Sequence, residues 1–217
     1  MKFQSIIHSR GTVQFPEFMA ERVYMREFYK GRGLPSDLKR WQPVVDTLLE
    51  GVDTDGPIYL MVDEGEVKAG STHRREGLHI DGYWNPTLNA HGGGHMPSRG
   101  GGHGYEPRDI SVYFPKRKRK QKLSSGWDHA TFEEAEGLIL ASSISACVGY
   151  VGEFEGPIKE GGDCSHIDLS PLKQISMERN VVYAGNVTAL HESVPVEHDC
   201  LRQLVRLNVP GWSPNLH

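Results

Sequence analysis

The sequence predicts a mostly β protein, built as an antiparallel sandwich or barrel. Roughly ten short runs are rich in β-branched and aromatic residues and are separated by turn signals. Helix candidates are few, and strand and helix patterns do not alternate as they do in parallel sheets. At 217 residues, the chain suits a single domain over residues 1–217 with large loops.

The first elements are two β-prone runs, KFQSII and TVQF, followed by the best helix candidate. This candidate covers residues 36–52, where apolar side chains recur at helical spacing after a Ser-Asp cap. Pro43 predicts either a kink or a helix that starts only there. The runs PIYLMVD and EVKAGS flank a turn-like EGE, so a hairpin is expected at 57–71.

Regular structure is expected to stop after the next strand, GLHID. Residues 82–107 are dominated by Gly, His, Pro and Asn, and this composition predicts a flexible loop, such as a lid or a substrate loop. A strand, DISVYF, is expected at 109–114. The basic run PKRKRKQK at 115–122 is expected to be a solvated loop, with contact to an anionic substrate such as nucleic acid as the alternative.

The C-terminal part is expected to consist almost entirely of strands. Residues 138–154 form one long or bent strand, or two. The later runs follow in the order CSHIDLS, KQISM, NVVYAG, NVTALHES and RQLVRLNV.

Composition excludes several classes of protein. The formal net charge of −4 does not indicate a nucleic-acid binder. No run approaches the roughly 18 apolar residues of a membrane helix, and the N-terminus does not resemble a signal peptide. Three widely spaced cysteines without a CxxC pattern predict reduced thiols and a cytoplasmic protein.

A histidine and an aspartate, His79 and Asp81, are spaced as two ligands of one metal ion. Residues i and i+2 of a strand point to the same side, so both side chains could reach one ion. Two neutral imidazoles and one carboxylate suit a divalent first-row metal. The third ligand must come from another strand, and the best placed histidine is His191, at the end of NVTALHES.

A second His-x-Asp, formed by His166 and Asp168, competes with the first. Only 22 residues separate Asp168 from His191. The four strands between the ligand-bearing strands of a jelly roll need roughly 40 residues. Between Asp81 and His191 there are 109. The first pair is therefore preferred, and the second is expected on a surface or structural strand.

Arg202 and Arg206 should face the same side of the RQLVRLNV strand. A guanidinium inside a barrel is unfavourable unless a carboxylate meets it. Arginines on a strand that otherwise carries Leu and Val therefore indicate a bound anion.

The ordered series His-x-Asp, His and Arg resembles the iron(II)- and 2-oxoglutarate-dependent dioxygenases, and GLHIDGYW and LHESVPV…RQLVRL carry the similarity. The resemblance implies a double-stranded β-helix (jelly-roll) core with a few flanking helices. It implies His79, Asp81 and His191 as ligands of Fe(II). Arg202 would bind the far carboxylate of 2-oxoglutarate, with Arg206 as the rival anchor.

The implied activity is hydroxylation or oxidative demethylation, with 2-oxoglutarate and O2 as co-substrates. The sequence does not identify the primary substrate, although the basic loop makes nucleic acid or a nucleotide a candidate. Tyr83 and Trp84 either line the substrate entrance or cover the core as rim aromatics. Each histidine ligand needs a hydrogen-bond acceptor for its second nitrogen. Asn186 and Glu192 lie nearby in sequence, but Glu192 should point away if its strand is regular.

Two other classes remain open at the sequence level. One is a cupin-like metal-dependent isomerase or epimerase, which needs no 2-oxoglutarate. The other is a non-catalytic β-sandwich binding module, which needs no metal.

Overall fold

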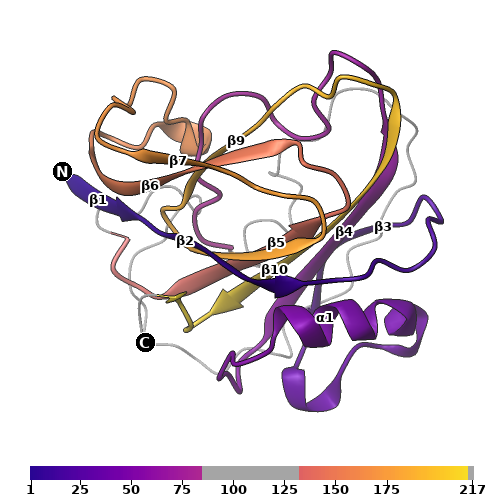
Figure 1. The fold of residues 1–217 in the computed structure, drawn as a ribbon. Coiled ribbons are helices and arrows are strands. Elements are labelled where there is room, and N and C mark those ends of the chain that lie inside the picture. Colours follow the sequence, from indigo (N-terminus) through magenta and orange to yellow (C-terminus); the bar gives the residue numbers. More distant parts are fainter. Residues whose placement is uncertain (85–131, 215–217) are drawn as a thin grey trace.

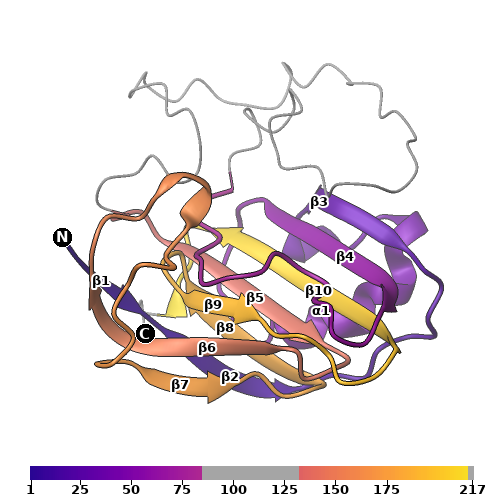
Figure 2. The same ribbon diagram turned by 90° about the horizontal axis from the view of Figure 1, so that it is seen from above.

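The computed structural model describes residues 1–84 and 132–214. Two antiparallel sheets face each other, and the helical region that contains α1 lies against the outer side of the larger sheet (Figures 1 and 2). The prediction of a mostly β protein is confirmed. Most of the Gly/His-rich segment (82–107), the expected strand 109–114 and the basic run 115–122 lie outside the described residues.

The larger sheet has six strands, in the order β2-β8-β5-β10-β4-β3. Their bounds are Ile7–Thr12 (β2), Val181–Asn186 (β8), Glu136–Ser142 (β5), Cys200–Pro210 (β10), Ile58–Val67 (β4) and Arg22–Phe28 (β3). The smaller sheet has four strands, and its centre is β6, which pairs with β1, β7 and β9. Their bounds are Lys2–Ser5 (β1), Cys147–Glu155 (β6), Lys173–Ser176 (β7) and Leu190–Ser193 (β9).

The main hydrophobic core lies between the larger sheet and the helical segments. Trp41, Val45 and Leu48 are fully buried against sheet residues such as Val205 and Leu207. Side chains of a strand alternate between its two faces. The residues of β10 next to Val205 and Leu207 therefore face the smaller sheet.

The expected helix at 36–52 is present in two pieces. A 3-10 helix, η2 (Ser36–Trp41), leads directly into the α-helix α1 (Gln42–Leu48), and Pro43 lies in its first turn. Proline is tolerated there because the first backbone N–H groups of a helix have no acceptor inside it. The two other helical segments are single 3-10 turns, η1 (Lys30–Arg32) and η3 (Glu160–Gly162).

The expected hairpin at 57–71 is wrong. Residues 58–67 form one continuous strand, β4, which runs through EGE without a turn. The long strand β10 provides partners along this whole length, including Cys200 opposite Val67 and Arg202 opposite Gly65. Pairing with a distant strand thus outweighs the local turn tendency of EGE.

Three other expected strands are also absent. Of TVQF, only Thr12 lies in a strand, as the last residue of β2. GLHID carries only isolated bridges at His79, and residues 164–170, which contain the second His-x-Asp, lie in turns between η3 and β7. The run 138–154 divides into β5 and β6, which belong to different sheets. No helix in the described part of the chain is long and apolar enough to cross a membrane.

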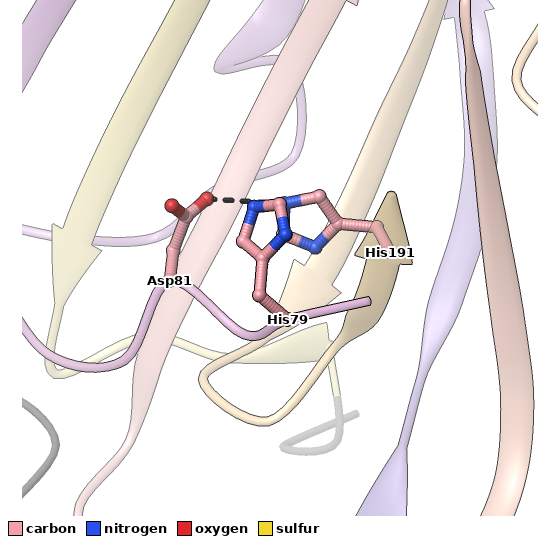
Figure 3. A group of neighbouring side chains, drawn as sticks. All are labelled: His79, Asp81 and His191. Atoms are coloured by element: carbon pink, nitrogen blue, oxygen red, sulfur yellow. Dashed lines mark ion pairs between the residues drawn. The ribbon is translucent and has the colours of Figure 1, made fainter. Parts of the chain in front are cut away.

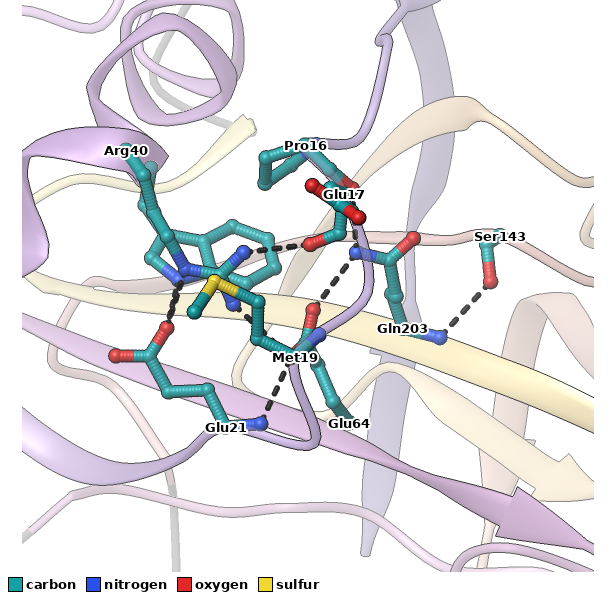
Figure 4. A network of polar contacts seen from close by, with 9 residues as sticks. Pro16, Glu17, Met19, Glu21, Arg40, Glu64, Ser143 and Gln203 are labelled. Atoms are coloured by element: carbon teal, nitrogen blue, oxygen red, sulfur yellow. Dashed lines mark hydrogen bonds and ion pairs between the residues drawn. The ribbon is translucent and has the colours of Figure 1, made fainter.

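A buried carboxylate, Glu64, joins β4 to the N-terminal segment (Figure 4). Its Oε2 accepts hydrogen bonds from the backbone N–H of Met19 at 3.0 Å and from Arg40 Nη2 at 2.9 Å. Its Oε1 accepts one from Gln203 Nε2 at 2.8 Å. These bonds offset the loss of hydration of the carboxylate. They also fix Gln203 of β10 on the side away from the smaller sheet.

Candidate metal centre

The structure brings His79, Asp81 and His191 together between the two sheets (Figure 3). One potential ligand atom from each residue lies within 4.8 Å of the others. Ligand atoms around one ion at about 2.1 Å are roughly 3 Å apart, so small side-chain rotations would close the group on a metal. Within residues 1–84 and 132–214, no other group of His, Cys, Asp and Glu meets this criterion.

The backbone fixes the two histidines relative to each other. The His79 N–H donates to the His191 carbonyl at 3.0 Å, and the His191 N–H donates back to the His79 carbonyl at 3.0 Å. Such a hydrogen-bonded pair places both side chains on one face. His191 lies on β9, where it is paired on its other side with Gly149 of β6. The ring centroids are 4.5 Å apart.

Hydrogen bonds also fix the ring nitrogen that each histidine presents. His79 Nδ1 lies 2.7 Å from the Gly77 carbonyl, and His191 Nδ1 lies 3.0 Å from the Ala189 carbonyl. A carbonyl can only accept, so each Nδ1 carries a hydrogen, and in the neutral form of each ring Nε2 has its lone pair available for a metal. Burial, and then the charge of His191, lowers the pKa of His79 to about 4, so its ring is neutral at pH 7.

Neither residue near in sequence is an acceptor for these nitrogens, and Glu192 was expected to point away on a regular strand. The Asn186 side chain binds the backbone of Ile6 and Gln4 instead. Glu192 points away and accepts a hydrogen bond from the Tyr150 hydroxyl at 2.5 Å. The true acceptors are main-chain carbonyls, which every residue carries and which a side-chain pattern therefore cannot reveal.

Asp81 is held by a cation on one side and faces the histidines on the other. Arg206 Nη1 lies 3.0 Å from Asp81 Oδ1, and His191 Nε2 lies 3.4 Å from Asp81 Oδ2. Burial opposes ionisation, but Arg206 and the two histidines outweigh it and hold the pKa of Asp81 well below its ordinary value. Asp81 is therefore an anion at neutral pH, with one oxygen directed toward the histidines.

The two arginines of β10 have different partners. Arg202 is only 3% exposed, and its Nε donates to Ser142 Oγ at 3.2 Å. No carboxylate in the described part of the chain forms an ion pair with it, whereas Arg206 is paired with Asp81. Burial, followed by the charge of Arg74, lowers the pKa of Arg202 to about 10. Arg202 is thus a buried cation without a counter-ion from the described protein.

Arg74 is a further cation of this region that the sequence analysis missed. Its Nη1 lies 3.7 Å from Asp63 Oδ2. Its side chain is 35% exposed. Burial, followed by the charge of Arg206, lowers its pKa, so its guanidinium lies within electrostatic reach of the arginines of β10. The one signal in the sequence is its position in HRREG, a few residues before His79, with two basic residues in succession.

A buried acid, Glu136 at the start of β5, was also missed. Its Oε1 accepts hydrogen bonds from the Trp84 backbone N–H at 2.8 Å and from Asn208 Nδ2 at 2.7 Å. The residue is 5% exposed, and burial raises the pKa of its carboxyl to about 7. The described structure therefore contains a carboxyl near Asp81 that changes its charge close to neutral pH.

The aromatic residues after Asp81 pack against other rings. Tyr83 stacks on Phe132 with ring centroids 5.5 Å apart, and its hydroxyl donates to the Glu134 carbonyl. Trp84 contacts Tyr24 and Tyr59 at centroid distances of 5.6 and 6.0 Å. These contacts are those expected of rim aromatics, and a role at the substrate entrance stays a prediction.

The competing His-x-Asp takes no part in the site. His166 and Asp168 are in turns, where His166 contacts the Pro157 carbonyl and Asp168 accepts the Ser170 backbone N–H. Asp168 is exposed. The histidines at 91, 95, 103 and 129 lie outside the described residues.

Comparison of the chain with protein-family models, with curated proteins and with solved structures gave no match. The functional argument therefore depends on the geometry of the site.

Proposed function

We propose that this chain is an iron(II)- and 2-oxoglutarate-dependent oxygenase with a jelly-roll, double-stranded β-helix core. One observation carries the proposal: two histidines and one aspartate converge beside a buried arginine that has no carboxylate partner among the described residues. The two facing antiparallel sheets, with the candidate ligands between them, support the jelly-roll assignment.

The donor set fits iron(II). Two imidazole nitrogens and one carboxylate oxygen would occupy one face of the ion and leave its other positions open. Fe(II) with 2-oxoglutarate would supply the activation of O2. His79 and His191 would each offer Nε2, and Asp81 would offer the oxygen that is not engaged by Arg206. No proton has to leave these groups at neutral pH before His79 and Asp81 can bind the metal.

Arg202 is the better candidate for the co-substrate anchor than Arg206. Arg206 already neutralises Asp81 at 3.0 Å, and moving it to another carboxylate would leave the aspartate without its cation. Arg202 neutralises no carboxylate of the described residues. Ser142, which lies beside it, has a hydroxyl that could also bind the carboxylate of the co-substrate. A bidentate guanidinium–carboxylate pair would supply the missing counter-ion.

Apolar side chains separate the two arginines on the inner face. Leu204 lies between them on β10 and is 5% exposed, and it packs with Met61 of the neighbouring strand β4. These apolar side chains would help to exclude water from the space between the metal ligands and Arg202. The chain would thus bind the co-substrate by its two ends and keep the intervening space dry.

The products and the primary substrate remain open within this proposal. Hydroxylation and oxidative demethylation both fit the site. Nucleic acid or a nucleotide is the candidate substrate because of the basic run at 115–122, which lies outside the described residues.

Anaerobic titration with Fe(II) and 2-oxoglutarate tests the proposal. A weak visible charge-transfer band should appear with the wild-type chain and vanish in His79→Ala. His166→Ala is the matched control, because it removes the histidine of the second His-x-Asp, and it should keep the band.

The other outcomes separate the competing functions. Metal binding without any effect of 2-oxoglutarate would favour a cupin-like isomerase or epimerase. Metal analysis that finds no ion in protein purified without chelators, and none after loading, would favour a non-catalytic β-sandwich module.

A further inference from the structure

Two of the three arginines near the space between the two sheets lack a close carboxylate partner among the described residues: Arg202 has none, and Arg74 has one at 3.7 Å. Arg74, Arg202 and Arg206 influence one another electrostatically there. The carboxylates that pair with them are Asp63, with Arg74, and Asp81, with Arg206. Buried charges of one sign destabilise a protein unless a counter-charge lies among them. Glu136, a further carboxyl near Asp81, hydrogen-bonds to Trp84 and Asn208 and forms no ion pair with these arginines. Arg202, which is buried and has no carboxylate partner in the described part of the chain, therefore indicates an anionic ligand.

Arg74 is supplied by a segment that packs over the Arg202 end of β10. Gly65 lies opposite Arg202 in the sheet, and a Cβ at Gly65 would be 3.3 Å from His73 Nε2. The segment is attached to the fold by two backbone hydrogen bonds with Val196: Gly70 N–H to its carbonyl at 2.8 Å and its N–H to the Ser71 carbonyl at 3.1 Å. Arg74 therefore approaches the anchor from a wall other than β10.

The internal partner of Arg74 is weak and shared. Its distance to Asp63 is 3.7 Å, which is longer than a direct hydrogen bond. Asp63 also faces Arg22 at 3.5 Å and His73 at 3.5 Å. A single carboxylate thus serves two guanidiniums, and Arg74 could turn to a stronger anion without leaving Asp63 unpaired.

We infer that Arg74 and Arg202 bind the same dicarboxylate from two walls of the site. This inference rests on the proposed function and deepens it. Arg74 makes the site select dianionic 2-oxo acids over monoanionic ones, because a second guanidinium adds attraction only where a second carboxylate is present. It is a binding residue for the co-substrate, and the metal ligands do not depend on it.

The role of Arg74 can be tested by calorimetry, in which a 2-oxo acid is titrated anaerobically into protein loaded with Mn(II) as an inert metal. The probes are 2-oxoglutarate and 2-oxopentanoate, which has the same number of carbons but lacks the far carboxylate. In Arg74→Ala, the Kd of 2-oxoglutarate should rise about tenfold, as expected for loss of one charged hydrogen-bonding partner. The Kd of 2-oxopentanoate should not change.

Arg22→Ala is the matched control, because it removes the other arginine paired with Asp63 but takes away a side chain that is 67% exposed. Its Kd for 2-oxoglutarate should stay within about twofold of wild type, since exposed ion pairs contribute little. Arg74→Lys should fall between wild type and Arg74→Ala. The Mn(II) affinity in the absence of a 2-oxo acid and the melting temperature report whether each variant is folded.

The possible failures are distinguishable. If the wild-type chain with Mn(II) does not bind 2-oxoglutarate, the proposed function is wrong, and this inference fails with it. If the wild type binds but Arg74→Ala binds equally well, the inference alone is overturned. It is also overturned if Arg74→Ala weakens both 2-oxo acids by the same factor, since Arg74 would then act through the fold or the metal.

Discussion

His79 and His191 exchange both of their backbone hydrogen bonds, each with a donor–acceptor distance of 3.0 Å. The two imidazoles are therefore positioned side by side by the main chain rather than by a metal. Replacing either side chain leaves this backbone pair in place. Binding of a metal and integrity of the fold should thus respond separately to substitution here.

His79→Ala and His191→Ala should each abolish stabilisation by metal. For the wild type, Mn(II) at a hundredfold excess over its Kd should raise the free energy of unfolding by roughly 2.7 kcal/mol. Neither variant should gain this increment, and both should remain cooperatively folded without metal. Denaturant unfolding with and without Mn(II) measures the difference. Full stabilisation of either variant would exclude that residue as a ligand.

Arg206→Met should destabilise the metal-free protein more than the metal-bound protein. Without Arg206, the carboxylate of Asp81 loses its cation at 3.0 Å, and breaking such a buried pair costs about 3 kcal/mol. A bound metal ion restores positive charge beside Asp81 and should recover part of this loss. Arg206→Lys should recover part of it without metal. Equal losses in the two states would show that Arg206 does not act through Asp81.

Arg202→Met should give the opposite result. Arg202 has no carboxylate partner among the described residues, so its replacement by an apolar side chain leaves no orphaned anion. Removing an unpaired buried cation should leave the unfolding free energy of the ligand-free protein unchanged or higher. The same variant should lose binding of 2-oxoglutarate in calorimetry with Mn(II). A strongly destabilised Arg202→Met would instead assign this arginine a structural role.

Glu136→Gln should make stability less dependent on pH. Burial raises the pKa of Glu136 from 4.5 in the unfolded chain to about 7 in the fold, so the folded state holds this proton more tightly. The contribution of the protonated form is fully present below pH 4.5, declines from there, and is lost as the pH rises through about 7. A glutamine side chain cannot ionise, and its amide oxygen can still accept hydrogen bonds from the Trp84 backbone N–H and from Asn208 Nδ2.

The stability of Glu136→Gln relative to wild type should therefore increase between pH 5 and pH 8, by up to about 3 kcal/mol. Urea unfolding of the metal-free proteins at the two pH values gives this difference. A relative stability that does not change with pH would show that Glu136 does not titrate in this interval.

Some helices and strands could be predicted from the sequence because local chemistry determines them. Strands that are rich in Val, Leu and Ile, such as β10, were predicted from this composition, and β10 is in fact buried without a break from Arg202 to Val209. The start of α1 at Gln42, one residue before Pro43, agrees with one of the two expectations, because a proline restricts its own backbone wherever it occurs. The hairpin within β4 was predicted wrongly because the residues that decide its pairing lie on β10, far along the chain.

For the site, the sequence by itself determined the inventory: one His-x-Asp far enough before a late histidine, and two arginines four residues apart on one strand. The tertiary structure decided which of these groups meet. It paired Arg206 with Asp81 and gave Arg202 no carboxylate partner among residues 1–84 and 132–214. It also brought in Arg74 and supplied main-chain carbonyls that orient the imidazoles. The physical reason is that spacing along one strand fixes the direction of its side chains, whereas distances and charges between strands arise only when the sheets pack.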